Sequence, residues 1–528
     1  MTMTAFTQWQ EWQREQQFTT LPLLLRMPLS DGEDRPASWE KAWETASPNA
    51  FVLESGKNGR YTYLGLSPVS LIRGKGDLAV TTDCRNGNVN EYRSKPLDAV
   101  RLWMSGFKAP WLPEGPKWTG GCIGFWSYDV VRSIERIPEF AADDLGLPDY
   151  LFMRMDELWI VDHHEQALYC AVHSQVTGEE SSGRLLQLYN AAIERAQAMS
   201  QLWAELTATE SVGRISGERS AVKLKQARVE LMEKGSLHID VEAVTGKTSP
   251  FSKEGFMEAV ERIRAYIAQG DVFQVNLSLR QSRETTTSPE ELYEWLRLLN
   301  PSPYMGFLRS PDFQLVSASP ELLVELRRGQ LAARPIAGTR RRGRTEEEDQ
   351  AMADELIGNE KERAEHIMLV DLERNDLGRI SAYGSVHVKE LMVIEYYSHV
   401  MHLVSQVEGT LAAGKDAYDV IAATFPGGTI TGAPKIRTME IIEEVEPVRR
   451  GPYTGSLGWI DYNGDMEFNI IIRTMTVKDG VVHIQAGAGI VIDSDPEREY
   501  HESLNKAKAL WKAIQYSEQW ARAQPIRG

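Results

Sequence analysis

The chain has 528 residues and a net charge of −17, with 42% hydrophobic and 25% charged residues. This length exceeds one typical hydrophobic core, so we expect several domains or one large composite domain. The acidic balance argues against general nucleic-acid binding, which requires a basic face. The three cysteines have no metal-ligand or CxxC spacing, which predicts neither a disulfide framework nor a zinc site. The N-terminus lacks a signal-peptide pattern and its longest apolar run is "LPLLL", so we expect a cytoplasmic protein without a membrane span.

Residues 50–170 are predicted to be rich in β-strands, because short alternating runs such as "RYTYLGL" and "ALYCAVH" are separated by glycine-rich turns. Apolar residues then recur at helical spacing over 182–206, which predicts a helix. Residues 207–250 are polar without a sustained apolar face and are interpreted as a linker. A further helix is predicted from the N-cap Ser252 to the C-terminal Gly270. Strands and helices mix from there to about residue 516.

Three glycine-rich segments lie in this second half: "RPIAGTRRRGR" (334–344), "FPGGTITGAPK" (425–435) and "QAGAGIVIDSDP" (485–496). If Pro434 is the first helical residue, the amides of Thr431, Gly432 and Ala433 leave a helix N-terminus, where an anion can bind. The third segment is predicted as a turn between a strand and a helix. The alternative for the second segment is a tight structural turn, and for the arginines of the first it is a solvated face beside acidic partners. Together the three segments favour a pocket for an anionic small molecule.

Two predicted helices carry carboxylates that could bind a hard cation. Glu365 lies in "NEKERAEHIMLVDLERND", and Glu502 lies in "PEREYHESLNKAKALW", four residues before Lys506. A carboxylate from each helix could hold Mg²⁺, which prefers a few carboxylates plus water and ligand oxygens. The alternative is a surface ladder of salt bridges. Glu321, at the end of the strand "FQLVSAS", is a candidate general acid, and His402 lies in an alternating apolar run.

The motifs "GDVFQVNLS", "SASPELL", "RPIAGTRRRG", "HVMHLVS", "FPGGTITGAPKIRTMEII" and "AGAGIVIDSDPEREYHESLNKA" occur in the order found in the chorismate-using enzymes, which the chain resembles over 251–516. "VLESGKNGRYTYLG" is similar to the N-terminal part of anthranilate synthase and aminodeoxychorismate synthase large subunits. The resemblance implies an α/β (α+β) fold, in which a layered β-sandwich formed by the N- and C-terminal parts is flanked by helices. It divides the chain into an N-terminal region (1–172), a helix and linker (173–250), a catalytic domain (251–516) and a tail (517–528).

The resemblance also implies residue roles. Glu365 and Glu502 would bind Mg²⁺, and Glu321 would be the general acid that helps a ring hydroxyl to leave. His402 would lie beside the reacting ring. The residues expected to line the chorismate site or hold the substrate carboxylates are Gly338, Thr339, Tyr453, Arg473, Gly487, Ala488, Gly489 and Lys506.

The motifs differ in which members of this family they favour. The water-using isochorismate and salicylate synthases of the family look to carry a lysine base at the position of Gln274. Glutamine cannot act as that base, so the resemblance favours an ammonia-using enzyme. Ala337 in "PIAGT" is typical of anthranilate synthases, whereas many aminodeoxychorismate synthases have lysine there. The other motifs are similar to aminodeoxychorismate synthases, some of which have this alanine. We therefore expect 4-amino-4-deoxychorismate as the product, with anthranilate as the alternative, and with Thr429, Thr431 and Asn469 tuning the pocket.

Two other classes stay open: a chorismate or tryptophan sensor without activity, and a lyase acting without ammonia. None of Cys84, Cys122 and Cys170 has a glutaminase setting, so ammonia is expected from a separate glutamine amidotransferase subunit. The segments "LES" and "PYM" resemble the tryptophan pocket of the family, which is expected here at Ser55, Pro303, Tyr304 and Met305.

Overall fold

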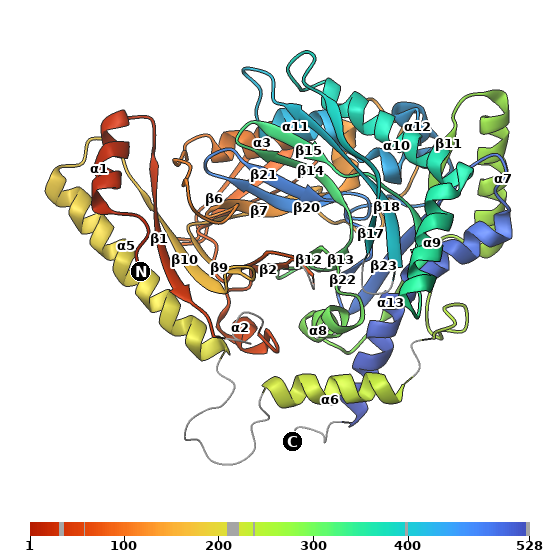
Figure 1. Cartoon of the computed structure of the whole chain (residues 1–528), viewed down its shortest axis with the longest axis horizontal. Coiled ribbons are helices and arrows are strands. Elements are labelled where there is room, and N and C mark those ends of the chain that lie inside the picture. Colours follow the sequence, from red (N-terminus) through yellow and green to blue (C-terminus); the bar gives the residue numbers. More distant parts are fainter. Residues whose placement is uncertain (31–35, 57–58, 208–220, 236–237, 397–399, 524–528) are drawn as a thin grey trace.

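The computed structural model describes residues 1–30, 36–56, 59–207, 221–235, 238–396 and 400–523. Its strands form two large sheets that face each other (Figure 1). Within the described residues the first sheet has 11 strands, in the order β1 (Thr20–Pro28), β10 (Ala167–Gln175), β9 (Glu157–Asp162), β3 (Tyr61–Gly65), β2 (Ala50–Glu54), β12 (Tyr304–Arg309), β13 (Gln314–Ser319), β22 (Thr474–Lys478), β23 (Val481–Ile490), β11 (Gln274–Glu284) and β19 (Gly432–Ala433).

The second sheet has 12 strands within the same residues. Along it lie β16 (Ile336–Arg341), β18 (Val400–Thr410), β15 (Gln330–Ala333), β14 (Leu322–Arg327), β21 (Met466–Asn469), β20 (Ser456–Asp461), β7 (Gly121–Trp126), β8 (Tyr150–Met155), β4 (Ser70–Lys75), β5 (Leu78–Asp83) and β6 (Val89–Arg93), and β17 (His387–Tyr396) pairs with β18. Both sheets combine strands from early and late in the chain, as at the antiparallel pair β2 and β12. The expected sandwich built from both parts of the chain is therefore confirmed.

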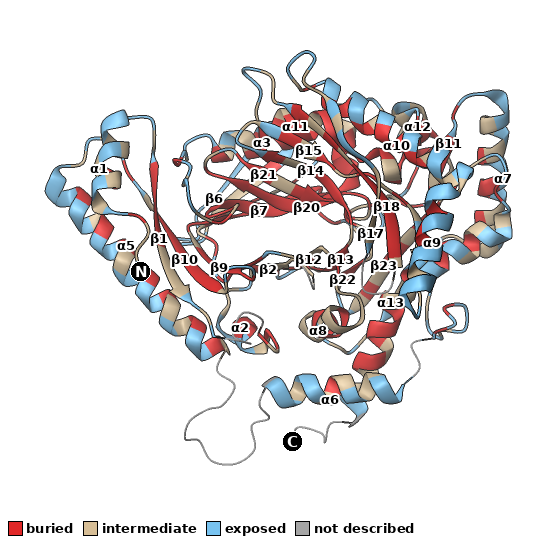
Figure 2. Ribbon diagram, viewed as in Figure 1, coloured by how far each residue is buried: buried red, intermediate tan, exposed pale blue. Residues whose placement is uncertain are grey.

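Helices cover the outer faces of the two sheets (Figures 1 and 2). They are α1 (Phe6–Glu15), α2 (Glu40–Thr45), α3 (Pro96–Met104), α4 (Val131–Ile134), α5 (Ser182–Thr207), α6 (Ala221–Lys234), α7 (Lys253–Gln269), α8 (Pro289–Leu299), α9 (Glu346–Gly358), α10 (Glu360–Gly378), α11 (Ala417–Thr424), α12 (Lys435–Val445) and α13 (Pro496–Ala523), with 3-10 turns η1 (Tyr128–Val130) and η2 (Gly428–Ile430). None of the described helices is both long and apolar enough to cross a bilayer.

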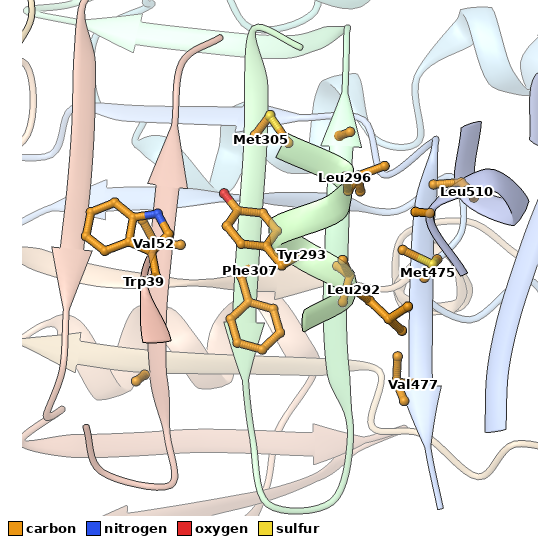
Figure 3. Packing of buried hydrophobic residues seen from close by; sticks show 14 of the residues in the cluster. Trp39, Val52, Leu292, Tyr293, Leu296, Met305, Phe307, Met475, Val477 and Leu510 are labelled. Atoms are coloured by element: carbon orange, nitrogen blue, oxygen red, sulfur yellow. The ribbon is translucent and has the colours of Figure 1, made fainter. Parts of the chain in front are cut away.

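Apolar side chains fill three layers. Phe51 and Leu308 of the first sheet meet Phe125 and Trp459 of the second, which forms the interior of the sandwich. The outer face of the first sheet packs against α8 and α13, where Tyr293 stacks on Phe307 with ring centroids 5.6 Å apart (Figure 3). The outer face of the second sheet packs against α3, α10 and α11. The helices thus hold the sheets in the positions that the site requires.

The helices predicted between residues 182 and 270 are confirmed, whereas the linker predicted between them is wrong in part. The helix at 182–206 is confirmed as α5, and α7 begins after Ser252 and ends before Gly270, which has the left-handed φ of 84°. Part of the predicted linker is instead the helix α6, which buries Arg228 against Glu40 and Glu291; residues 208–220 lie outside the described residues. This helix was not predicted because ion pairs of the buried Arg228 help to hold it, and a search for apolar periodicity does not detect such contacts. The last helix, α13, also continues into the predicted tail. The division into four sequence regions stays a prediction.

Candidate active site

Glu321 lies where β13 ends and β14 has not yet begun, with only 7% of its surface exposed. Its backbone carbonyl accepts a hydrogen bond from Ile470 N at 3.0 Å, which fixes the bend. Burial raises the pKa of its carboxyl to about 7, and it outweighs the opposing effects of the Thr429 side chain and the charges of Arg473 and Lys506. A carboxyl that keeps its proton near neutral pH can act as a general acid.

Arg473 lies in the segment between β21 and β22, where its charge acts on the Glu321 carboxyl. Its φ is 49°, a left-handed conformation that costs a residue with a side chain free energy and persists where the surrounding structure enforces it. Here the Arg473 carbonyl accepts a hydrogen bond from Ala318 N at 3.1 Å. The charge of Glu321 acts on its guanidinium, although burial lowers the Arg473 pKa. Tyr453 precedes Thr454, whose amide donates a hydrogen bond to Ile471 O at 2.8 Å, and the Tyr453 ring lies 5.7 Å from the guanidinium of Arg450.

His402 and the Gly338–Thr339 segment lie on the paired strands β18 and β16. His402 Nδ1 lies 3.0 Å from Thr339 Oγ1 and 3.2 Å from Gly338 O. The β16 register shifts between Ala337 and Thr339, and Gly338 has a φ of 62°. The positive φ favours glycine, and a Cβ there would lie 2.7 Å from Leu356 Cδ1, so the end of that side chain would have to shift. Burial lowers the His402 pKa, which favours a neutral imidazole.

The third glycine-rich segment is not the predicted turn. Gly487, Ala488 and Gly489 belong to β23 and pair with β11. A Cβ at Gly489 would lie 2.3 Å from Gln274 Nε2, and one at Gly487 would lie 2.4 Å from Leu277 O. The glycines are therefore needed for the close approach of two strands rather than for a change of direction. Ala488 points into the core, whereas the Gly487 carbonyl accepts a hydrogen bond from Lys506 Nζ at 3.0 Å.

The two predicted metal ligands lie beside the same strands. Gln274 Nε2 donates a hydrogen bond to Glu365 Oε1 on α10 at 3.2 Å, and Lys506 Nζ contacts Glu502 Oε1 on α13 at 3.0 Å. Lys506 also acts on the charge of Glu365, whose pKa burial raises. Among the described residues no three His, Cys, Asp or Glu side chains already converge as a metal cage. Mg²⁺ usually takes one or two protein carboxylates and completes its shell with water and substrate oxygens, so this pair of donors fits Mg²⁺.

The second glycine-rich segment also differs from its prediction. Pro434 precedes α12 rather than beginning it, and Gly432 and Ala433 form the short strand β19 against β11. The Thr431 amide donates to Gly428 O at 3.3 Å and its hydroxyl to Gly427 O at 2.9 Å. The helix therefore begins one residue later than predicted and the Thr431 groups bond within the protein, while the anion site at this segment stays a prediction. Strand pairing with a distant segment is invisible in the local sequence.

The arginines of the segment 334–344 lie in part beside acidic partners, as the alternative interpretation predicted. Arg340 contacts Glu362 Oε1 at 3.0 Å and Glu355 Oε1 at 3.2 Å, and Arg342 pairs with Asp349. These ion pairs tie β16 to α9 and α10. They hold the Gly338 segment in place beside His402.

A cavity of about 280 Å³ lies between the two sheets, and Glu321 is not among the residues that line it. Ser55, Pro303, Tyr304 and Met305 all line it, which brings together the four residues predicted for the tryptophan-like pocket. Asn469 also lines this cavity, donates to Tyr304 O at 3.4 Å and accepts from Leu457 N at 3.0 Å. The Asn469 side chain is therefore engaged at this cavity. Among the three predicted tuning residues, Thr429 is the one whose side chain acts on the Glu321 carboxyl.

Sequence reasoning assigned no role to Glu373, Asp376 and Lys435, which lie buried or half-buried on α10 and α12. Asp376 and Lys435 form an ion pair. The signal available was the helical spacing of Glu373 and Asp376, which places both on the side of α10 that carries Leu369 and Leu377.

Comparison with known proteins places this site in a family. A family model described as chorismate binding enzyme matches residues 48–512. The chain belongs to the chorismate binding enzymes. It is 48% identical to aminodeoxychorismate synthase component 1 of Bacillus subtilis, over 89% of this chain and 92% of that protein. It is 40% identical to anthranilate synthase component 1 of Acetivibrio thermocellus, over 91% and 93% of the two chains. The crystal structure of anthranilate synthase component I from Streptococcus pneumoniae matches with a TM-score of 0.69 and 35% identity, over 87% of this chain and 93% of that one.

In this chorismate binding enzyme, two cationic side chains act on the buried Glu321 carboxyl. Arg473 and Lys506 supply positive charge, and Glu321 supplies a protonated carboxyl among them. Such a pocket can bind an anionic substrate and protonate a group that leaves from it. Glu365 lies on α10 and Glu502 on α13, and Lys506 is a charged neighbour of both.

Proposed function

We propose that this enzyme aminates chorismate with ammonia to give 4-amino-4-deoxychorismate, in a Mg²⁺-dependent reaction. The observation that carries the proposal is the buried Glu321 carboxyl, which keeps its proton to about pH 7 beside Arg473 and Lys506. Amination at carbon 4, rather than carbon 2, is supported by the identity of 48% to an aminodeoxychorismate synthase component against 40% to the anthranilate synthase component of Acetivibrio thermocellus.

The residues divide the reaction between them. Arg473 and Tyr453 hold a substrate carboxylate, and the planar guanidinium suits that group. Glu365 and Glu502 would hold Mg²⁺, which supplies positive charge opposite the ring carboxylate. Glu321 donates its proton to the departing hydroxyl, so the C–O bond breaks and water leaves. Ammonia forms the new C–N bond, and the proton that its nitrogen releases restores Glu321.

Anthranilate synthesis is the second candidate because Ala337 removes the lysine that many aminodeoxychorismate synthases carry at this position. Ala337 is buried on β16, so the pocket has no nucleophile there and ammonia itself must add. A chorismate or tryptophan sensor would not need a protonated carboxyl beside a cation site, and a lyase acting alone would not need ammonia.

The product decides between these candidates. The purified chain is incubated with chorismate, Mg²⁺ and ammonium, and products are followed by mass and fluorescence. We expect 4-amino-4-deoxychorismate without pyruvate, converted to 4-aminobenzoate only after a separate lyase is added. Fluorescent anthranilate with an equal amount of pyruvate would establish the second candidate, and conversion without ammonium would establish the lyase.

We further propose that the enzyme is cytoplasmic and receives ammonia from a separate glutamine amidotransferase subunit. The word "component" in the relatives' names supports a second subunit for those proteins.

A further inference from the structure

Arg450 is a buried arginine that the proposed reaction does not use. It lies three residues before Tyr453, in the segment between α12 and β20, with 3% of its surface exposed. A guanidinium stays charged in a protein, so burying it is costly unless the charge is paired and each N–H group has an acceptor. The acceptors of Arg450 come from three segments that the proposed reaction depends on.

The first segment is the strand β11. Arg450 Nε donates to Glu446 Oε2 at 2.9 Å and Nη2 donates to Glu446 Oε1 at 2.6 Å, which makes a two-pronged ion pair. Glu446 Oε1 also accepts hydrogen bonds from the amide and the hydroxyl of Ser278 on β11, both at 2.9 Å. Arg450 Nη2 reaches the same strand directly, at Asn276 O, at 2.7 Å. Arg450 is therefore fixed to the strand that begins with Gln274.

The other two segments are η2 and the turn that carries Tyr453. Arg450 Nη1 donates to Ile430 O of η2 at 3.0 Å and to Thr454 Oγ1 at 3.4 Å. With these bonds all five N–H hydrogens of the guanidinium have acceptors. A lysine has three N–H hydrogens on a single nitrogen and could not join the same segments.

Tyr453 is held from both sides by contacts that lead to Arg450. Its ring centroid lies 5.7 Å from Arg450 Cζ, and its amide donates to Arg450 O at 3.2 Å. On the other side the Thr454 hydroxyl, which accepts from Arg450, donates to Tyr453 O at 2.6 Å. Thr454 has a φ of 60°, a conformation that costs a β-branched residue free energy and persists where its surroundings enforce it. Arg450 is one of the groups that enforce it.

We propose that Arg450 is a positioning residue that acts through Tyr453. By joining the Tyr453 turn to β11 and η2, it makes the tyrosine meet a substrate carboxylate from one fixed direction. Gln274, at the start of β11, donates to Glu365 at 3.2 Å, so the same strand connects Arg450 with the carboxylate expected to bind Mg²⁺. The inference rests on the proposed role of Tyr453 in binding chorismate and holds for amination at either ring carbon.

The test compares Arg450→Lys with the matched control Arg228→Lys in the full chain. Arg228 is also a buried arginine, whose Nη2 pairs with Glu291 at 2.6 Å and with Glu40 at 2.9 Å. These partners lie on α8 and α2, which carry none of the residues assigned to the chorismate site. Initial rates are measured over a range of chorismate concentrations with Mg²⁺ and saturating ammonium, and stability is measured by urea unfolding.

In Arg450→Lys we expect the KM for chorismate to rise about tenfold or more, with a smaller change in kcat. Arg228→Lys should lower the urea midpoint and leave the KM unchanged, because a loss of folded enzyme lowers only the apparent kcat. A wild-type KM in Arg450→Lys would overturn the inference. An equal rise of the KM in both variants would overturn it too, since it would mean that any buried ion pair has this effect.

Thr454 gives a milder test if Arg450→Lys folds poorly. Thr454→Val removes the hydroxyl that joins Arg450 to Tyr453 but keeps the branched shape, so the KM for chorismate should rise. Thr454→Ser keeps the hydroxyl and should raise the KM less. The same KM in both variants would contradict the inference.

Tyr453→Phe separates the inference from the proposed function. If Arg450 acts through Tyr453, Arg450→Lys should raise the KM little further in a Tyr453→Phe background, whereas full additivity of the two effects would overturn the inference. An unchanged KM in Tyr453→Phe alone would remove the role of Tyr453 and the inference with it. The proposed function fails separately, if the wild type forms no aminated product from chorismate and ammonium.

Discussion

Individual side chains in the pocket owe their chemistry mainly to how far they are removed from water. Glu321 and Glu373 are ordinary carboxyls whose pKa values burial moves to about 7 and about 8. The sequence indicated Glu321 because a carboxylate followed a strand end. It assigned no role to Glu373, because the burial of Glu373 Oε2 without a hydrogen-bond partner among the described residues depends on tertiary packing.

The pH dependence of the rate follows from Glu321. Its folded-state pKa of about 7 lies above the ordinary value of 4.5, and the acid is active only while protonated. At constant free NH₃ we therefore expect kcat/KM for chorismate to be high below pH 7 and to fall as the pH rises beyond it. Initial rates from pH 5 to 9 check this. A decline already complete by pH 5 would contradict it, because that is the behaviour of an exposed carboxyl.

Loss of either metal-binding carboxylate should remove the charge opposite the substrate. We expect Glu365→Gln or Glu502→Gln to lower kcat/KM at least about a hundredfold, close to 3 kcal/mol, with unchanged circular dichroism. A chelator should abolish wild-type activity, and added Mg²⁺ should restore it. Glu497→Gln is the control, since Glu497 is an exposed carboxylate of α13 that pairs with Lys253. Normal turnover by either variant would mean that the metal assignment is wrong.

At the scale of elements, the strands β2, β3, β5, β9 and β10 and the helices α5 and α7 were predictable from alternation, helical spacing and end signals. The glycine-rich segments were not. Their glycines serve close approach between strands, as at Gly489, or a bulge, as at Gly338, and the partner strand lies far away in sequence. A glycine-rich pattern indicates that side chains are excluded at these positions, but it does not indicate which neighbouring element excludes them.

Gly338 gives a test of this role. In Gly338→Ala the positive φ should cost ~1–2 kcal/mol of unfolding free energy, and the added Cβ would also meet Leu356 and Glu362. We expect a lower midpoint in urea and a loss of activity, because the Thr339–His402 contact moves with the bulge. Gly414→Ala is the matched control: Gly414 has a φ of 76° with no atom within 4 Å of a Cβ, so stability should fall while activity stays. Equal activity loss in both variants would contradict a specific role for the bulge.

The whole molecule lacks a thiol suited to glutamine hydrolysis among its three cysteines. Cys122 and Cys170 are fully buried, and burial raises the pKa of all three thiols, that of Cys170 to about 12, whereas a nucleophilic thiol has a lowered pKa. We therefore expect the isolated chain to use ammonium salts, with rates limited by free NH₃, but not glutamine. Glutamine-dependent turnover by the pure chain would contradict the need for a second subunit, and addition of an amidotransferase subunit should confer it.

The cavity between the two sheets, which Ser55, Pro303, Tyr304 and Met305 line, gives a prediction about tryptophan binding. Tryptophan should inhibit only weakly if the product is 4-amino-4-deoxychorismate, although the four predicted residues line one cavity. Initial rates over a range of tryptophan concentrations check this, with Asn469→Ala as a variant that alters the cavity wall. Strong inhibition that Asn469→Ala relieves would favour anthranilate synthesis.

The pairing of β2 with β12 also constrains how a ribosome can deliver this protein. Phe51 finds its strand partner in Leu308, so the middle of the first sheet stays open until some 250 further residues have emerged. β23, which separates β22 from β11, ends only at Ile490. The early strands must therefore wait with unpaired edges through most of translation, and they depend on helices such as α5, or on chaperones, for cover. A nascent chain released after residue 172 should be sensitive to proteases, and two halves of the gene expressed separately should reconstitute the enzyme poorly.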